Sequence, residues 1–365
     1  MKSGPPGPGE AFTVSPNAGL LSLGLILLAA PLALGTARLA GAGSSLIARM
    51  KADTEALQRL ALCADRAMEL LSEEEPHEPD SFLNPYQTQI DALAAESGTG
   101  ITLTDLSSRF NLNTLRKSMF QGTELLTYMK PGMSPAALQQ HRVDAGFSLE
   151  TARHYGDFFY AEALARYLTP WGYWNINTAD EFSLEQIFAI RSGDEAAAGW
   201  FHGRIREALE EGRLISAEEL QGFIGLDYYK EIFPLINAAP PININTADEW
   251  IIAQLLSYPA FRVSDPEATT RSLISLRRGR AISRAEIIDL IPVSPEKERN
   301  EKGEEVLSKE ENRLFAWLGD TTWFWEIRVV DEAGGVYTRV VARLPDESEL
   351  GRERRYRIVR EEIPW

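Results

Sequence analysis

The pattern of apolar and charged residues at the start of the chain predicts a helix long enough to span a membrane. No charged residue occurs between Ala11 and Ala37. Residues 20–37 are about the length that a helix with a rise of about 1.5 Å per residue needs to cross a bilayer. We therefore expect a leader over residues 1–19 and a transmembrane helix over 20–37. A cleaved secretory signal peptide is the alternative, because the residues before Ala37 are mostly small and Pro31 interrupts the apolar core.

An amphipathic pattern follows this apolar stretch. Its apolar residues recur at the three-, four- and seven-residue steps of one helix face, and they are Leu46, Met50, Leu57, Leu60, Ala64, Met68 and Leu71. Pro76 marks the end of the pattern, since proline cannot continue a helix. Residues 38–75 are therefore expected to form an amphipathic stalk helix that runs on from the apolar segment.

Strand patterns occur only at the two ends of the remaining chain. β-branched and alternating residues indicate strands over residues 101–113, 322–330, 336–344 and 354–363. Between them the period is helical, with helices expected over residues 114–129, 134–143, 148–168, 183–190, 194–210, 216–223, 247–257, 266–277 and 284–290. An isolated terminal hairpin would be marginal in water. We therefore expect an α+β fold in which residues 76–113 and 313–365 form a small antiparallel sheet, split by a large all-α insertion over 114–312.

The helical region contains an internal repeat. The sequence Asn-Ile-Asn-Thr-Ala-Asp-Glu occurs at residues 175–181 and again at 243–249, which lie 68 positions later. Phe110–Thr114 looks like a third copy of this opening alone, with Arg116 in place of the acid. The opening has the chemistry of a helix start. The expected N-cap and third helical residue are Asn177 with Asp180, and Asn245 with Asp248.

A second pair of sequences keeps almost the same offset. Residues 212–220 (GRLISAEEL) match residues 279–287 (GRAISRAEI), with their serines 67 positions apart. The expected capping boxes are Ser216 with Glu219 and Ser283 with Glu286. Two landmarks at one offset define repeats near 171–237 and 240–291.

Charge and chemistry-bearing residues argue against nucleic-acid binding and against catalysis. The 365 residues include 53 acids and 37 bases, a net charge of -16 that repels phosphate backbones. Cys63 is the single cysteine and cannot form an internal disulfide. The sequence has no metal-binding spacing and no nucleophile or P-loop motif. Its histidines are His77, His141, His154 and His202. We expect a protein that is not an enzyme.

The repeat openings resemble the helix-hairpin-helix modules of competence DNA receptors. In that family a Gly-x-Gly hairpin directs backbone N–H groups at a phosphate. At the corresponding positions this chain has residues 191–194 (RSGD) and 258–261 (YPAF), neither with paired glycines. A membrane-anchored DNA receptor is therefore the alternative function, and a helical scaffold is the preferred interpretation of the repeats.

The whole chain resembles general secretion pathway protein K, a minor pseudopilin of type II secretion systems. The resemblance depends on the order of an apolar helix that follows a glycine, the sequence DLSSRFNLN at 105–113, the two openings at 175–181 and 243–249, and closing strands. It covers roughly residues 19 to 345. It implies a pilin-like fold split by a helical domain, with prepilin peptidase processing at Gly19 and Leu20 as the mature N-terminus.

The resemblance also implies the partners and the location of the protein. I- and J-type minor pseudopilins would join it in the pseudopilus tip, the complex that starts the filament driving protein export across the outer membrane. The major pseudopilin, the secretin pore and secreted substrates are further implied partners. The expected location is the inner membrane, with a single span and a periplasmic head. Some relatives bind calcium through carboxylates of the head, but no calcium-type loop here allows ligands to be mapped.

Overall fold

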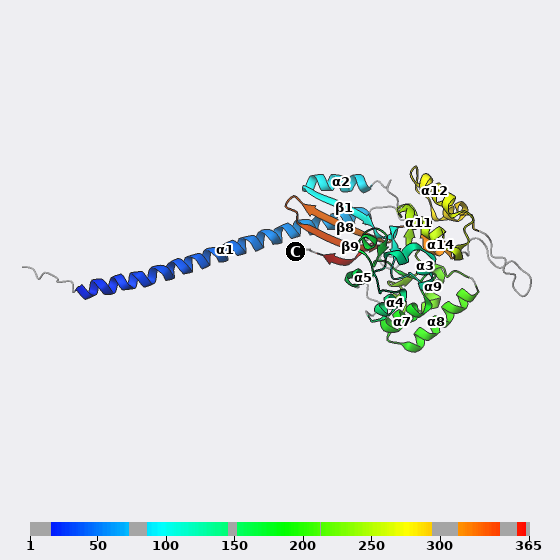
Figure 1. The fold of residues 1–365 in the computed structure, drawn as a ribbon, viewed down its shortest axis with the longest axis horizontal. Coiled ribbons are helices and arrows are strands. Elements are labelled where there is room, and N and C mark those ends of the chain that lie inside the picture. Colours follow the sequence, from blue (N-terminus) through cyan, green and yellow to red (C-terminus); the bar gives the residue numbers. More distant parts are fainter. Residues whose placement is uncertain are drawn as a thin grey trace, which may run out of the picture. The chain divides into compact units, whose positions relative to one another are not determined.

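The protein was analysed as a computed structural model that describes residues 16–72, 86–144, 152–211, 213–293, 313–343 and 356–362. The chain forms two compact units, Met1–Arg59 and Leu60–Trp365. Helix α1 (Pro16–Ser72) begins in the first unit and ends in the second (Figure 1). Residues 38–72 of the predicted stalk helix therefore belong to one helix with the segment before them, and residues 73–75 of that prediction lie outside the described residues.

The prediction of an inner-membrane location with a single span over residues 20–37 is wrong. A helical span requires about 20 consecutive apolar residues. Among the residues that the structure describes, no helix is both long enough and apolar enough to meet that requirement.

The second unit contains a four-stranded antiparallel sheet. The sheet consists of β1 (Thr99–Asp105), β8 (Phe324–Asp331), β9 (Val336–Arg343) and β10 (Tyr356–Glu362), in the order β1-β8-β9-β10. β1 pairs with β8 over its whole length, from Thr99 opposite Asp331 to Asp105 opposite Trp325. Two strands far apart in the sequence are therefore direct neighbours. The predicted α+β fold with a small antiparallel sheet is confirmed.

One face of the sheet is covered by the end of α1 and by α2 (Tyr86–Ser97), a helix that the sequence pattern did not predict (Figure 1). The amphipathic stripe of α1 accounts for this packing, because Leu60, Ala64 and Leu71 are buried against the sheet. Trp325 and the neighbouring inward-facing residues of β8 and β9 complete this core. The sheet and the helix thus bury each other's apolar faces.

Between β1 and β8, the described residues form three successive loops, each closed by a two-residue parallel bridge. Loop A extends from β2 (Phe110–Asn111) to β3 (Leu168–Thr169). Loop B extends from β4 (Trp174–Asn175) to β5 (Ile236–Asn237), and loop C from β6 (Ile242–Asn243) to β7 (Leu318–Gly319). The insertion is therefore a series of closed loops joined by short linkers.

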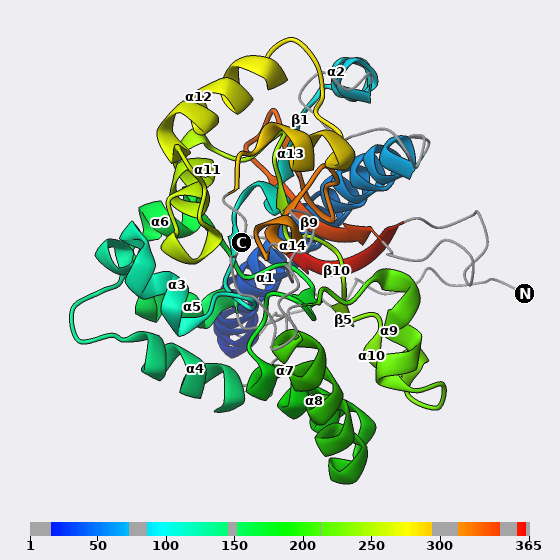
Figure 2. The ribbon, with the colours of Figure 1, turned by 90° about the vertical axis from the view of Figure 1, so that its right-hand side faces the viewer.

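Each loop is filled by helices (Figure 2). Loop A contains α3 (Lys117–Gly122), η2 (Glu124–Tyr128), α4 (Pro135–Asp144), α5 (Ala152–Phe158) and α6 (Ala161–Arg166). Loop B contains α7 (Glu181–Ser192), α8 (Glu195–Glu210), α9 (Ala217–Ile224) and α10 (Tyr229–Ile232). Loop C contains α11 (Glu249–Leu256), η4 (Pro259–Phe261), α12 (Pro266–Arg277), α13 (Arg284–Leu290) and α14 (Leu314–Trp317).

Two expected helices are interrupted. The helix expected over 148–168 is two helices, α5 and α6, and the one expected over 114–129 ends in a 3-10 turn. Met129 forms an antiparallel bridge with Phe159, and the backbone N–H of Lys130 donates to Phe158 at 2.8 Å. This pairing separates α5 from α6, whereas α3 already ends at Gly122, before the extended backbone of Thr123. Residues 148–151 of the expected helix lie outside the described residues.

Loops A and C share one apolar core, whereas loop B has its own. A fourth cluster lies where the linkers between loops meet the second face of the sheet, and it includes Leu106, Trp171, Tyr173 and Phe324. This cluster therefore joins the helical insertion to the sheet.

Candidate functional site

The three loop openings share one hydrogen-bonding pattern, built by the first asparagine of each Asn-x-Asn sequence. Its side-chain oxygen accepts the backbone N–H two residues later, at 2.8 Å for Asn111, 2.8 Å for Asn175 and 3.0 Å for Asn243. Its amide nitrogen donates to the linker that follows the same loop. The acceptors are Tyr173 O at 2.9 Å, Ala239 O at 2.7 Å and Thr322 Oγ1 at 2.9 Å. Each such asparagine therefore fixes the start of its loop to the chain that leaves the loop.

The second asparagines of the two full repeats are not helix N-caps, contrary to the sequence prediction. Asn177 donates to Ile215 O at 2.9 Å and accepts from Ile215 N at 2.8 Å. Asn245 makes the same pair of bonds with Ile282, at 2.9 and 2.7 Å. Both side chains are buried and act as a strand-like partner for an otherwise unpaired backbone.

The N-caps lie three residues further along. Asp180 accepts the backbone N–H of Ser183 at 2.9 Å, and Asp248 accepts that of Trp250 at 2.9 Å. The aspartates therefore precede their helices and do not occupy the third helical position. The sequence led to the wrong residue because asparagine and aspartate are equally good N-caps, and only burial distinguishes their roles here.

The second landmark of each repeat forms a complete capping box. Ser216 accepts from Glu219 N, and Ser283 accepts from Glu286 N, while each glutamate accepts the serine's backbone N–H. Arginines six residues before the glutamates also contact them, Arg213 in loop B and Arg280 in loop C. The hydrogen bond from Arg280, together with those from Ser283, lowers the pKa of Glu286 to about 2.

A buried carboxylate joins the sheet to loop C. Asp105, the last residue of β1, accepts from Ser107 N at 2.7 Å through one oxygen. Its other oxygen accepts from Thr322 Oγ1 at 2.7 Å, from Asn243 Nδ2 at 3.3 Å and from the hydroxyl of Thr246. These four hydrogen bonds satisfy the buried carboxylate. Asp105 thus ties the end of β1 to the opening of loop C and to the linker before β8.

Arginines connect the loops to one another. Arg116, which aligns with the capping acid of the other openings, donates to Thr178 O at 2.7 Å and to Ala179 O at 2.6 Å in loop B. Arg166 of loop A forms a 3.1 Å ion pair with Asp248 of loop C. Where the other two openings have a capping aspartate, loop A therefore has Arg116, which contacts loop B.

The hairpin turn of loop B has chemistry that does not suit a phosphate. Gly193 ends α7 with a φ of 67°, and Asp194 then caps α8 by accepting Ala197 N at 2.9 Å. The Asp194 carboxylate also accepts from the hydroxyl of Tyr228 at 2.6 Å, and this bond lowers the pKa of Asp194. A carboxylate thus occupies the position where a helix-hairpin-helix module would receive a phosphate.

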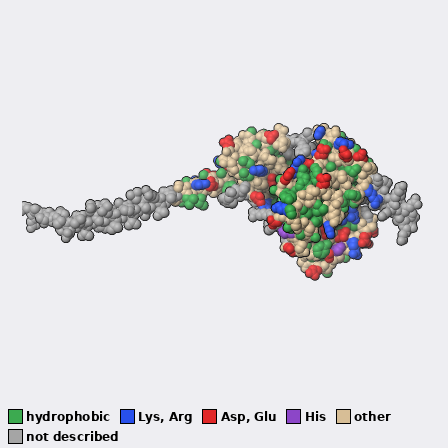
Figure 3. Space-filling model, viewed as in Figure 1, with side chains coloured by type: hydrophobic (Ala, Val, Ile, Leu, Met, Phe, Trp, Pro, Cys, Tyr) green, Lys and Arg blue, Asp and Glu red, His purple; other side chains and the backbone are tan. Residues whose placement is uncertain are grey.

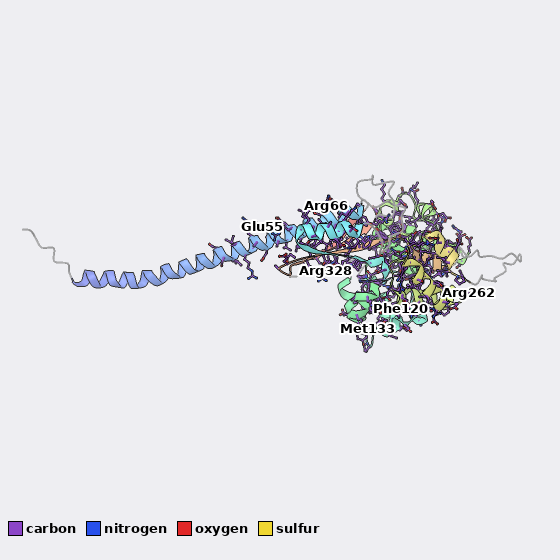
Figure 4. The ribbon with its side chains drawn as sticks, turned by 90° about the horizontal axis from the view of Figure 1, so that it is seen from above. Glu55, Arg66, Phe120, Met133, Arg262 and Arg328 are labelled. Carbon is purple, nitrogen blue, oxygen red and sulfur yellow. The ribbon has the colours of Figure 1, made fainter. Side chains whose placement is uncertain are left out.

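The end of α1 is fixed on the sheet by a charged contact as well as by apolar packing. Arg339 of β9 is 4 % exposed and pairs with Asp65 of α1 while donating to Tyr337 Oη at 3.0 Å. Cys63 lies in the same interface and is buried. Arg66 of α1 pairs instead with Glu69 at 2.7 Å (Figure 4, where Arg66 and the strand residue Arg328 are labelled).

In the first unit, the same helix exposes its apolar side chains. Leu46 is 58 % exposed, Ile47 69 % and Met50 60 %. Figure 3 shows hydrophobic side chains on this part of α1. Leu46 and Met50 continue the stripe that is buried further along the helix, since the positions 50, 57, 64 and 71 are seven residues apart. Among the described residues, no other element covers this apolar face of α1.

Of the four histidines, His141 and His202 lie among the described residues, whereas His77 and the side chain of His154 lie outside them. Within the described ranges, no group of three or more His, Cys, Asp and Glu side chains could hold a metal ion. His202 contacts Glu185 at 2.6 Å, and His141 packs on Phe158. An open groove of about 440 Å³ near the start of β1 is lined by small and apolar residues such as Ala94, Gly100 and Val330. Gly19 and Leu20 lie in α1, at positions whose side chains are outside the described residues.

The chain was compared with family models, curated proteins and solved structures. No family model matches the chain, and no curated protein matches it. The chain is similar to a chain in the crystal structure of the GspK-GspI-GspJ complex from the type 2 secretion system of enterotoxigenic Escherichia coli. The similarity covers 87 % of this chain and 99 % of that chain, at 13 % identity and a TM-score of 0.29. GspK, the protein that the sequence motifs resemble, is one of the three proteins in that complex.

Proposed function

We propose that the protein is a minor pseudopilin of a type II secretion system and assembles with I- and J-type minor pseudopilins into the pseudopilus tip complex. The observation that carries this proposal is that the apolar residues of α1 are buried in one part of the helix and exposed in another. Residues 60–71, in its last turns, pack against a small antiparallel sheet. Leu46 and Met50 belong to the same apolar stripe, and their side chains are exposed. A helix of this kind suits a subunit that packs side by side with other helices.

The insertion supports a position at the end of the filament. Loops A, B and C extend from Phe110 to Gly319, which is a longer stretch of chain than the helix and sheet that carry them. A head of that bulk would clash with neighbouring heads in a tightly packed shaft. At the tip it meets only the pore or the substrate. We therefore expect one copy per filament.

The assembly step can be tested by co-purification with the I- and J-type subunits. Met50→Glu places a charge in the uncovered stripe and should reduce recovery of the ternary complex at least tenfold, because a charge in an apolar helix interface is left without a partner. Leu62→Glu is the matched control, since Leu62 is 67 % exposed on another side of the same helix. Equal recovery with both variants would contradict the proposal.

The position in the filament needs a separate measurement. Quantitative labelling of sheared filaments should give about one copy per filament, at one end. Copies spaced along the shaft, in numbers comparable to the major subunit, would rule out the tip position even if the complex forms.

Processing at Gly19 is part of the same proposal. Intact mass of the mature protein should correspond to a start at Leu20, and Gly19→Ala should abolish that cleavage. A start near residue 38 would instead indicate signal-peptide cleavage and a scaffold of another type.

A further inference from the structure

Helix α8 of loop B presents an outer face with an exposed tryptophan. The opposite face of α8 packs on α7 and α9, and its residues Phe201, Ile205 and Leu209 are buried there. Both ribbon views show α8 at the margin of the helical insertion (Figure 1 and Figure 2). Trp200 lies on the outer face and is 50 % exposed. Tryptophan is enriched among the residues that anchor protein interfaces.

The side chain of Trp200 is held by its neighbours. The Arg204 guanidinium lies 5.1 Å from the centre of the Trp200 ring and 4.6 Å from the ring centre of Phe223 in α9. Arg204 Nη1 also donates to Gly222 O at 2.7 Å. Arg204 is thus tied to α9, and its cation–π contact restricts the Trp200 ring. An ordered side chain loses less conformational entropy when a partner binds.

Two glycines form a shallow notch beside Trp200. Gly199 and Gly203 are four residues apart, so they lie on one side of α8, and both are exposed. Apart from atoms of α8 itself, a Cβ at either position would meet no described atom within 4 Å. Packing within the described part of the chain therefore does not require these glycines, although each makes a helix interior less stable than alanine would. Without a Cβ, both positions allow another backbone to approach α8 closely.

The charge of loop B favours a basic partner for this face. Residues 174–237 include 12 acids and five bases. Three of the five bases already have partners within loop B, and they are Arg204, Arg206 and Arg213. Glu207, seven residues after Trp200 and on the same side of α8, is exposed. An excess of carboxylates attracts a cationic partner and repels an acidic one.

We propose that the outer face of α8, from Ala196 to Glu207, docks a basic amphipathic helix of another protein. Trp200 packs on the apolar side chains of that helix, and the notch at Gly199 and Gly203 lets the two helices approach closely. Lysine or arginine residues at the margin of the partner helix meet carboxylates such as Glu207. The docking face includes no residue of α1, so its test and the test of assembly have separate outcomes.

The test is the binding of a labelled helical peptide to the full chain, measured by fluorescence anisotropy. The probe has leucine and alanine on one face and lysine on the other, and the same peptide with glutamate in place of lysine is the charge control. Trp200→Ala should weaken binding of the lysine peptide by about tenfold or more. Phe182→Ala is the matched variant, because Phe182 of α7 is also 50 % exposed in loop B, and it should bind as wild type does. Equal affinity of wild type and Trp200→Ala, or of the two peptides, would overturn the proposal.

Gly203→Leu separates docking from folding. Leucine is a better helix former than glycine, and its Cβ meets open space at this position. The midpoint of thermal unfolding should therefore rise by about 2 °C. The same side chain fills the notch and should weaken binding of the lysine peptide by about tenfold, through a clash with the approaching helix. A stable Gly203→Leu variant that binds the lysine peptide as tightly as wild type would also refute the proposed docking.

Discussion

At the scale of single residues, asparagine side chains do here what backbone pairing does in a regular sheet. Asn245 offers a donor and an acceptor at the spacing of a peptide group, and Ile282 uses both. Asn177 and Ile215 repeat this arrangement in loop B. A short hydroxyl or a carboxylate cannot replace an amide at such a position, because neither offers both a donor and an acceptor at that separation.

Asn245→Ala should therefore destabilise the protein by about 2–3 kcal/mol, since it leaves two buried backbone groups of Ile282 unsatisfied. Chemical unfolding of the full chain measures this difference. Asp248→Ala removes the half-buried N-cap of the same helix, together with its ion pair to the exposed Arg166, and should cost about 1 kcal/mol. If Asn245→Ala costs no more than Asp248→Ala, the amide is not a structural bridge.

Glu286 predicts a contribution to stability that depends on pH. Its pKa falls from 4.5 to about 2 because of Arg280 and Ser283, so the folded state favours the charged carboxylate. The resulting stabilisation is complete above pH 4.5 and is lost as the pH falls through about 2. Glu286→Gln should therefore be less stable than wild type at pH 7, with the difference shrinking towards pH 2. Glu267→Gln, which removes a carboxylate from an exposed helix pair, is the control for the loss of a surface charge.

At the scale of elements, the interface between α1 and the sheet combines apolar packing with the buried charge of Arg339. Apolar residues of α1, such as Leu60 and Leu71, lie in one buried cluster with Trp325 and Ile327 of β8. Arg339 and Asp65 add a contact that fixes the register of the helix along β9. Apolar stripes alone permit a helix to slide by a turn, so we infer that the ion pair selects one position.

Asp65→Ala should be more damaging than Arg339→Met. The first leaves a buried guanidinium without this carboxylate, at a cost of about 1–3 kcal/mol, reduced from the value for fully buried pairs because Asp65 is 48 % exposed. The second removes the buried charge itself and leaves an aspartate that water can reach. Unfolding of both variants in urea checks the order. The opposite order would show that the pair contributes mainly through Arg339 packing.

At the scale of the whole molecule, the negative net charge argues against nucleic-acid binding. The net charge is -16, and on the face shown in Figure 3 acidic side chains are interspersed with basic ones. The full chain titrated with duplex and single-stranded DNA should bind no more tightly than non-specific background. Submicromolar binding with a steep salt dependence would contradict the scaffold interpretation, because phosphate contacts release counterions.

Much of this architecture follows from sequence pattern, and the failures have a common cause. Period and alternation located the sheet strands and most helices, and the duplicated openings indicated the repeats. The roles of Asn177, Asp105 and Arg339 were not predictable, because each depends on a partner between 38 and 274 residues away. The third copy at Phe110–Thr114 was visible in the sequence, but its closing partner Leu168–Thr169 has no sequence signature.

The closed loops affect which insertions and deletions the sequence can accept during evolution. Trp174 lies beside Ile236, and Ile242 lies beside Leu318, so the chain leaves each loop where it began. Neighbouring strands are about 5 Å apart, whatever length of chain lies between them. Residues can therefore be gained or lost inside a loop without moving β1 relative to β8. The outer surface of the head can diverge rapidly while the helix and sheet beneath it stay the same.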